Sequence, residues 1–299
     1  MTGFLILDKA QGITSFGALA RLRRLTGQKK AGHTGTLDPM ATGVLPIALG
    51  GATRFIDFLP SDDKAYRAKI RLGLTTDTLD ITGKIVNESQ VKTDPQEFEA
   101  ALKQFVGPIE QIPPMYSAVS KDGVRLYKLA RQGLEVERKA RRVEIYSAVL
   151  IGFDLSLNEY EVDIACSAGT YIRTLADDLG RLLGCGASLS ALRRTAANGF
   201  ELKSAHSLEK LEEAENIKDI KDFLIPTDKA LAAYPKVRVT EAQALRFKNG
   251  GALDLERLAP LKEKKGLFRL YSPRADFLGL GEVDRSLEQM KVRRVFSSK

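Results

Sequence analysis

The chain has 299 residues, of which 43% are hydrophobic and 28% are charged, a composition typical of a globular protein with one large domain or a large and a small one. Its formal net charge of +8 favours a polyanionic partner, most commonly a nucleic acid. The two cysteines do not make a disulfide framework. The sequence shows no signal-peptide pattern and no apolar run near the ~18 residues of a membrane span. We therefore expect a cytoplasmic protein.

The first fifty residues predict a strand, a helix and a second strand around one unusual loop. Residues 4–7 are a short apolar run typical of a strand, and Ser15 is placed to cap a helix that extends to about Leu25. Residues 45–49 predict a buried strand. The loop at 32–46 contains three glycines, two prolines, one histidine and a single carboxylate.

This loop is a candidate site because glycine and proline impose backbone shapes that other residues do not adopt, and shaped loops often carry function. Its single carboxylate, Asp38, has two readings that the loop alone does not separate. Either Asp38 starts a turn with Pro39 by bonding to its own backbone, or it is a catalytic carboxylate.

The middle of the chain predicts a strand, a helix and a strongly basic segment. Residues 64–74 alternate apolar and basic side chains, which indicates a strand with Tyr66 on its apolar face. Residues 94–106 have the pattern of an amphipathic helix. Residues 121–142 carry eight basic and three acidic side chains around one tyrosine, which is typical of a phosphate-binding helix and loop or of a solvated helix face.

The following segment predicts two strands and then a helix. Strands at 142–151 and 160–166 precede a helix for which Thr170 is the predicted cap, and Arg173 lies off the apolar stripe of that helix. Arg173 therefore pairs either with Asp177, one helical turn further on, or with an acid from another segment.

The C-terminal part changes from helical to β-rich. A polar helical stretch at 207–221 is followed by a linker at 231–235. The short strands expected after the linker are at 237–239, 267–270, 277–283 and 292–295.

Several common catalytic centres find no support in this chain. The two histidines, His33 and His206, do not lie near a cysteine at a spacing typical of zinc ligands. There is no phosphate-binding loop of the Gly-x-x-x-x-Gly-Lys-Ser/Thr type, and the glycines at 279 and 281 lack the rest of a dinucleotide fingerprint. No nucleophile-elbow motif supports a serine-histidine-acid triad.

Five ordered segments of the chain have distinctive residue types: Leu7-Asp8-Lys9 with Gly12-Ile13-Thr14-Ser15, the Asp38 loop, Lys64-Ala65-Tyr66, Gln111-Ile112-Pro113-Pro114-Met115-Tyr116-Ser117-Ala118, and Gly169-Thr170-Tyr171-Ile172-Arg173. In these segments the chain resembles the TruB family of tRNA pseudouridine synthases, and the resemblance covers nearly its whole length. The family usually has proline where this chain has Ala10, which puts the support of the entry loop in doubt, and often a basic residue where it has Ser120, which concerns one backbone contact.

The resemblance implies an α+β pseudouridine synthase fold, with a mixed, mainly antiparallel central sheet flanked by helices and a small C-terminal PUA-like β domain. It implies a catalytic domain at 1–232, with 121–142 as a mobile thumb, and an RNA-binding domain at 236–299. The implied partner is tRNA, held by its T-arm and acceptor stem, with no cofactor, no metal, no membrane and no required protein partner. We expect a monomer.

The resemblance also implies roles for individual residues. Asp38 is the nucleophile, which attacks either the sugar or the base of the T-loop uridine at position fifty-five, and Arg173 is the cation that keeps it ionised although buried. Tyr66 stacks on the flipped base and takes its C5 proton, although a core tyrosine with one hydrogen bond has the same pattern. The remaining implied substrate contacts are His33, Tyr171, Leu192, Ile112 and Lys9. For His33 a structural role is an equal alternative, and for Lys9 a structural or phosphate contact is favoured.

Three other functions remain open from the sequence. The chain could bind and refold tRNA as a chaperone without modifying it, alone or in addition to catalysis. It could resemble the H/ACA-guided enzymes, whose C-terminal module is usually larger, so the free-standing bacterial type is the better match. A plain RNA-binding module would not need the Asp38 loop.

Overall fold

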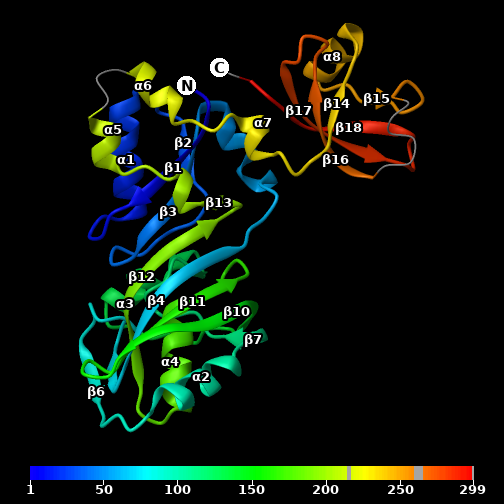
Figure 1. The fold of residues 1–299 in the computed structure, drawn as a ribbon. Coiled ribbons are helices and arrows are strands. Elements are labelled where there is room, and N and C mark those ends of the chain that lie inside the picture. The colour runs from blue at the N-terminus through cyan, green and yellow to red at the C-terminus, as the bar shows by residue number, and fades with distance from the viewer. Residues whose placement is uncertain (214–216, 259–264, 298–299) are drawn as a thin grey trace.

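The computed structural model describes residues 1–213, 217–258 and 265–297, and its main feature is one long sheet (Figure 1). The strand order is β1-β3-β12-β4-β11-β10-β7, with β2 beside β3 and β13 beside β12. All these pairings are antiparallel except that of β12 with β3, so the predicted mixed, mainly antiparallel sheet is confirmed. The strands are β1 (Gly3–Lys9), β2 (Ala31–His33), β3 (Thr42–Leu49), β4 (Lys64–Leu72), β7 (Gly107–Gln111), β10 (Arg141–Asp154), β11 (Glu159–Cys166), β12 (Ala187–Ala197) and β13 (Phe200–Glu201).

Helices cover the two ends of this sheet. Helices α2 and α4 pack against β10 and β12, and α1 and α5 pack beside β1 and β2 (Figure 1). In the core, Phe98 of α2 stacks on Tyr160 of β11 with ring centroids 4.1 Å apart. The helices of this part are α1 (Ser15–Thr26), α2 (Pro95–Lys103), α4 (Ile172–Leu182), α5 (Leu208–Glu212), α6 (Ile217–Asp222), α7 (Thr227–Ala230), η1 (Gly50–Phe58) and η2 (Leu202–Ser204).

Two small hairpins project from the sheet beside the site. In the first, β5 pairs with β6, and in the second, β8 pairs with β9 directly before helix α3. Their bounds are β5 (Leu74–Thr76), β6 (Ile85–Glu88), β8 (Ser120–Lys121), β9 (Val124–Arg125) and α3 (Leu126–Arg131).

Both predicted helix caps differ from those in the structure. Helix α1 is capped by Thr14, whose side chain accepts a hydrogen bond from the Gly17 N–H, because the neighbouring Ser15 hydroxyl bonds to the backbone of Leu37 instead. The cap position of α4 is Tyr171, without a side-chain cap, and the Thr170 hydroxyl donates to the Ser167 carbonyl.

Two expected elements are divided, and several strands were not predicted. The strand expected at 64–74 ends at Leu72, because Gly73 adopts φ +81° and a Cβ there would lie 2.7 Å from the Ser89 carbonyl oxygen. The helical stretch expected at 207–221 contains the two short helices α5 and α6, and residues 214–216 lie outside the described residues. Strand β12, in the middle of the sheet, was not predicted.

In its described residues, the C-terminal region forms a separate five-stranded sheet with its own apolar cluster and the helix α8. The four expected strands are present, and β15 and α8 were not predicted. Phe277 and Phe296 pack against Phe55 of η1 with ring centroids 5.9 and 6.0 Å away, which joins this region to the rest of the chain. The elements are β14 (Lys236–Arg238), α8 (Glu241–Lys248), β15 (Leu253–Asp254), β16 (Gly266–Tyr271), β17 (Phe277–Asp284) and β18 (Gln289–Val295).

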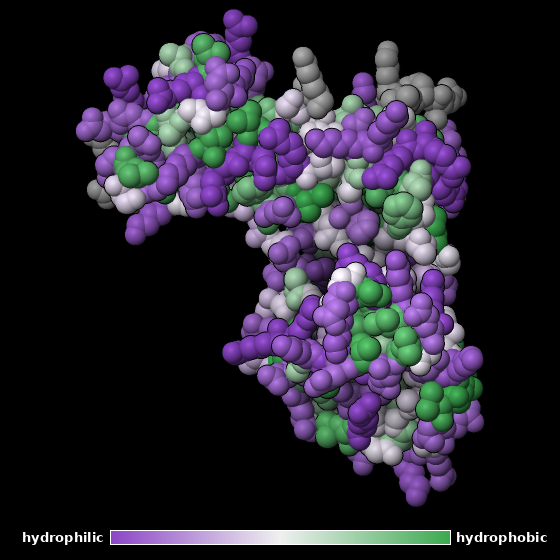
Figure 2. Space-filling model, turned by 180° about the vertical axis from the view of Figure 1, so that it is seen from behind, coloured by the Kyte–Doolittle hydropathy of each residue, from purple (hydrophilic) through white to green (hydrophobic). Residues whose placement is uncertain are grey.

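The molecule has a bent outline, because the C-terminal sheet stands to one side of the long sheet (Figure 1). In Figure 2 the inner side of this bend is lined mainly by hydrophilic side chains. None of the helices in the described residues has the length and apolar character needed to cross a membrane.

Candidate active site

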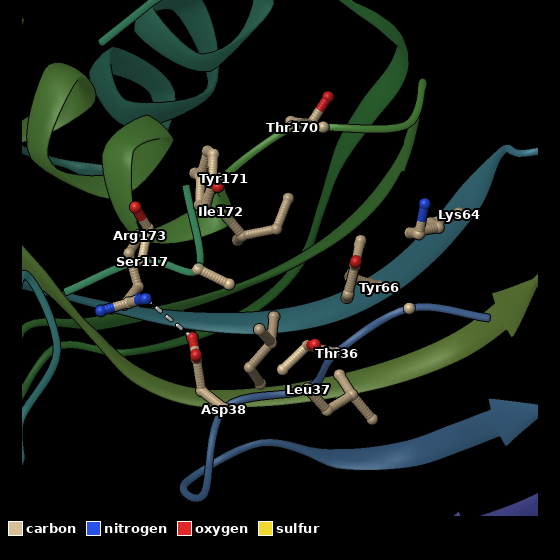
Figure 3. Close-up of a pocket in the computed structure, with 14 residues that line it drawn as sticks. Thr36, Leu37, Asp38, Lys64, Tyr66, Ser117, Thr170, Tyr171, Ile172 and Arg173 are labelled. Atoms are coloured by element: carbon tan, nitrogen blue, oxygen red, sulfur yellow. Dashed lines mark ion pairs between the residues drawn. The ribbon is translucent and has the colours of Figure 1, made fainter. Parts of the chain in front are cut away.

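A cavity of about 250 Å³ opens where the Asp38 loop, strands β4 and β12 and the loop before α4 meet (Figure 3). Five of the predicted site residues line it: Asp38, Tyr66, Tyr171, Arg173 and Leu192. The other lining residues are Gly35, Thr36, Leu37, Lys64, Ser117, Ala118, Gly169, Thr170 and Ile172. Segments from five parts of the sequence therefore converge on one hollow.

The Asp38 loop is held in shape from below by the entry loop. The buried Lys9 ammonium donates to the carbonyls of Ala10 at 2.9 Å, Ile13 at 2.8 Å and Pro39 at 3.4 Å. The Ser15 hydroxyl both donates to the Leu37 carbonyl and accepts from its N–H. These bonds fix the backbone on both sides of Asp38.

The geometry joins Asp38 to Arg173. Arg173 Nη2 lies 3.0 Å from Asp38 Oδ2 (Figure 3). Its Nη1 lies 3.6 Å from Asp80 Oδ2. The guanidinium also donates to the carbonyls of Thr78 at 3.1 Å and Tyr116 at 2.8 Å, so its position is fixed from three segments. Asp177 pairs with Arg181 at 2.9 Å instead, so the predicted alternative of an Arg173–Asp177 helix pair is wrong.

Arg173 and Asp80 act on the pKa of Asp38 in opposite directions. Burial raises the pKa of the Asp38 carboxyl above its usual value, the Arg173 cation lowers it, and the nearby Asp80 carboxylate raises it. The Asp38 side chain is 36% exposed, and that of Arg173 is 6% exposed. The Asp38 carboxylate is thus open to the cavity, whereas its counter-ion is almost fully buried.

Tyr66 forms part of the cavity wall on β4, opposite Arg194 of β12. Burial raises the pKa of the Tyr66 hydroxyl to about 12, and the Arg194 guanidinium acts in the opposite direction. At neutral pH the phenol is protonated, and its ring presents an apolar surface beside Asp38.

Two further predicted residues shape the segment before α4. The Tyr171 N–H donates to Gln111 Oε1 at 2.9 Å and its carbonyl accepts from Gln111 Nε2 at 3.3 Å, which fixes the backbone directly before Arg173. Ile112 follows Gln111 but does not line the cavity, and its side chain is exposed.

His33 and Lys9 also lie outside the cavity lining. Burial lowers the pKa of His33, and its buried Nδ1 lacks a hydrogen-bond partner within the described structure. Burial lowers the pKa of Lys9 to about 8. The placement of Lys9, fully enclosed by carbonyl groups, favours its structural reading.

Sequence reasoning did not identify Asp80 or Arg194, both of which are buried at the site. Asp80 lies in the β5–β6 hairpin, where its surroundings of threonines resemble an ordinary polar turn. Arg194 looks like one of a pair of surface arginines, and the local alternation from the buried Leu192 through Arg193 is the signal that could have placed it inward. No group of three or more histidine, cysteine or acidic side chains is placed to hold a metal ion in the residues that the structure describes.

The basic segment at 121–142 borders the cavity. The Tyr127 N–H donates to the carbonyl of the lining residue Ser117 at 3.1 Å, and Arg138 Nη1 donates to the Pro113 carbonyl at 3.2 Å. Of its eight basic side chains, Arg138 is half-buried and the others are exposed. The positive charge therefore faces solvent beside the cavity mouth.

Comparison with known proteins gives consistent matches along the chain. Residues 23–172 match the family described as TruB family pseudouridylate synthase (N terminal domain), residues 173–232 the tRNA pseudouridylate synthase B C-terminal domain, and residues 235–296 the family described as Pseudouridine synthase II TruB, C-terminal. The chain is 42% identical to a tRNA pseudouridine synthase B of Clostridium tetani over 94% of this chain and 96% of that protein. It is 46% identical to a protein of the same name from an Azoarcus species over 94% of this chain and 90% of that protein.

Solved structures give the same fold. The chain superimposes with a TM-score of 0.72 and 25% identity on a chain from the crystal structure of a Cbf5-Nop10-Gar1 complex, over 99% of this chain and 85% of that one. A chain in an H/ACA RNP structure bound to a substrate RNA has the same TM-score at 24% identity, and it supports the fold alone.

Proposed function

This chain belongs to the TruB family of pseudouridylate synthases, and on that premise we propose that it converts the T-loop uridine of tRNA to pseudouridine with Asp38 as nucleophile. The family resemblance expected from the sequence is confirmed by the matched families and by relatives at 42% and 46% identity. The chain is a tRNA pseudouridine synthase, an isomerase. The single observation that supports Asp38 as its nucleophile is the 3.0 Å ion pair with Arg173 at a cavity.

The reaction breaks the N1–C1′ bond of uridine and joins C5 of the base to the same sugar carbon. A carboxylate can serve as nucleophile toward C1′, or toward the base, because it is a good leaving group in the second half of the reaction. Asp38 must be ionised for this role. Burial disfavours the ionised carboxylate, and the positive charge of Arg173 offsets this effect. Arg173 does so from a side that leaves one face of the carboxylate open.

The cavity is a site for a flipped base. A nucleobase that reacts at C1′ and C5 has to leave its stack, at a cost of a few kcal/mol, roughly 2–4. Within the proposal, the Tyr66 ring and Leu192 hold the uracil, and Tyr171 sets the wall before Arg173. Tyr66 then accepts the C5 proton. We also propose that His33 supports the T-loop once the uridine has flipped out of it, and that Ile112 contacts the RNA at the cavity margin.

The rest of the RNA meets two basic surfaces in this proposal. Residues 1–232 form the catalytic domain, in which the thumb at 121–142 contacts T-arm phosphates through its exposed cations. Residues 236–299 form a PUA-like domain directed at the acceptor stem. The enzyme acts as a cytoplasmic monomer without a protein partner.

The experiment is to map the product in unmodified tRNA after incubation with the purified chain. The expected result is pseudouridine at the T-loop uridine, no product when that uridine is replaced by cytidine, and no product with Asp38→Asn. The matched control is Asp57→Asn, an exposed aspartate on η1 away from the cavity, which retains activity. Product elsewhere in the tRNA would contradict the T-loop assignment.

The likeness to Cbf5 supports one alternative, a guide-dependent enzyme. Guide dependence requires that the chain is inactive on tRNA alone, so the same experiment separates the two. A chaperone function predicts faster refolding of tRNA by Asp38→Asn as well as by the wild type, and it can coexist with catalysis.

A further inference from the structure

Arg194 is a fully buried cation beside the active site that the mechanism described so far does not use. Its Nε donates to the Val44 carbonyl at 2.7 Å, its Nη1 to Thr36 at 3.3 Å and its Nη2 to Gly35 at 3.1 Å. Within the described ranges 1–213, 217–258 and 265–297, no carboxylate pairs with it, whereas its neighbour Arg193 pairs with Asp8 at 2.7 Å.

A buried guanidinium without an acid partner is an unfavourable arrangement, because carbonyl dipoles only partly replace the lost hydration. The three carbonyls explain part of its presence, since Gly35 and Thr36 belong to the Asp38 loop and Val44 follows that loop on β3. Hydrogen bonding to carbonyls does not by itself require a full charge. A group that becomes negative during the reaction does require one.

Tyr66 is that group. Tyr66 and Arg194 are direct partners across β4 and β12, a position in which side chains on the same face touch. The Arg194 guanidinium lowers the pKa of the Tyr66 hydroxyl, and Tyr66 in turn raises the pKa of Arg194. The other charged or titratable groups that act on this hydroxyl are Asp38 and Cys166, which disfavour its ionisation. Arg194 is thus the cation placed to favour a phenolate at Tyr66.

We propose that Arg194 is a positioning residue that binds the Tyr66 phenolate while it removes the C5 proton and, through Gly35 and Thr36, sets the distance of that oxygen from Asp38. This inference rests on the proposed function. In the form of the reaction in which Asp38 attacks the sugar, C5 has already displaced the carboxylate from C1′. The C5–H bond then breaks, its electron pair forms the C5=C6 double bond, and the electrons of the N1=C6 bond move to N1. N1 takes a proton from solvent. The Tyr66 phenol has given its own proton to solvent before this step, and the phenolate that takes the C5 proton becomes the resting phenol again.

The test compares Arg194→Lys and Arg194→Gln with the wild type in single turnovers on tRNA that carries either hydrogen or deuterium at C5 of the T-loop uridine. Arg193→Gln is the matched control, because it makes the same change at the next residue on the opposite face of β12. Lysine keeps the charge but lacks the forked guanidinium that reaches the carbonyls and the phenol together. Because it keeps the charge, Arg194→Lys is the second variant if Arg194→Gln does not fold. Circular dichroism and tRNA binding establish that each variant is folded.

If Arg194 acts through Tyr66, both variants slow the reaction by about tenfold or more, a fraction of what a general base contributes, and raise the C5 deuterium isotope effect. In a Tyr66→Phe background the same substitutions change the rate much less, because their partner is gone. Arg193→Gln leaves the isotope effect at the wild-type value.

A purely structural role for Arg194 slows the attack of Asp38 and leaves the C5 isotope effect unchanged or smaller, and that result overturns the inference. Failure of the proposed function is distinct from this. It appears as a wild-type chain that forms no pseudouridine with either substrate.

Discussion

Replacement of Arg173 by methionine tests the electrostatic core of the site. The substitution keeps the length and most of the volume of the side chain but removes the cation that lies 3.0 Å from Asp38 and 3.6 Å from Asp80. Two carboxylates then face each other without a counter-ion. Because Arg173 lowers the pKa of Asp38 and Asp80 raises it, we expect the Asp38 pKa to rise in the variant.

The size of the effect on the rate follows from the distance. For unit charges 3.0 Å apart and an effective dielectric constant of about 20, Coulomb's law gives about 5 kcal/mol as an upper bound. Asp38 is 36% exposed, so solvent screening reduces this to about 3 kcal/mol, roughly a 100-fold loss of rate.

The assay is the pH dependence of single-turnover pseudouridine formation. The acid side of the profile, where Asp38 loses its proton, moves to higher pH in Arg173→Met and to lower pH in Asp80→Asn, which removes the opposing carboxylate. Arg181→Met is the control, since it lies on the same helix, pairs with Asp177 and is 75% exposed. Identical profiles for Arg173→Met and the wild type, or a shift of both variants in one direction, would refute the reasoning.

Three further predictions concern other parts of the structure. We expect Tyr66→Phe to bind tRNA with wild-type affinity but to form product at least about 100-fold more slowly, because it lacks a proton acceptor. An equal loss of tRNA affinity and of turnover rate would contradict this prediction. In chemical unfolding at increasing pH, the wild type gains stability relative to Lys9→Met between about pH 8 and 10.5. Burial lowers the Lys9 pKa to about 8 in the folded state, so the folded chain binds fewer protons than the unfolded chain in that window. A stability difference that does not change with pH would refute this prediction. Lys128→Ala combined with Arg131→Ala weakens tRNA binding and lowers the slope of log affinity against log salt by about 2, whereas an unchanged slope would remove this helix from the phosphate contacts.

The fold was predictable where side chains follow a regular period. Strand β4 buries Tyr66, Ala68, Ile70 and Leu72 as its alternation indicates, and the stripe of α4 is buried as its helical spacing indicates. Strand β12 was missed because two irregularities in its register, after Leu189 and after Arg194, break the period of two, and because it buries an arginine.

The candidate site was predictable only in part for a similar reason. Asp38, Tyr66 and Arg173 lie in segments whose residue types are distinctive, and the structure brings them to one cavity. The Asp80 contact depends on the hairpin of β5 and β6 docking onto β12 through the Ile81 N–H and the Leu189 carbonyl. No local pattern near Asp80 encodes that contact, which forms between segments about a hundred residues apart.

The central claim is that Asp38 initiates the isomerisation, and tritium release from C5 of the T-loop uridine measures it most directly. Wild type and Asp38→Asn are compared on the same labelled, unmodified tRNA, with binding measured in parallel. The account predicts that both bind the tRNA and that the wild type alone releases tritium. Release by Asp38→Asn at the wild-type rate, or tight binding without release by the wild type, would contradict it.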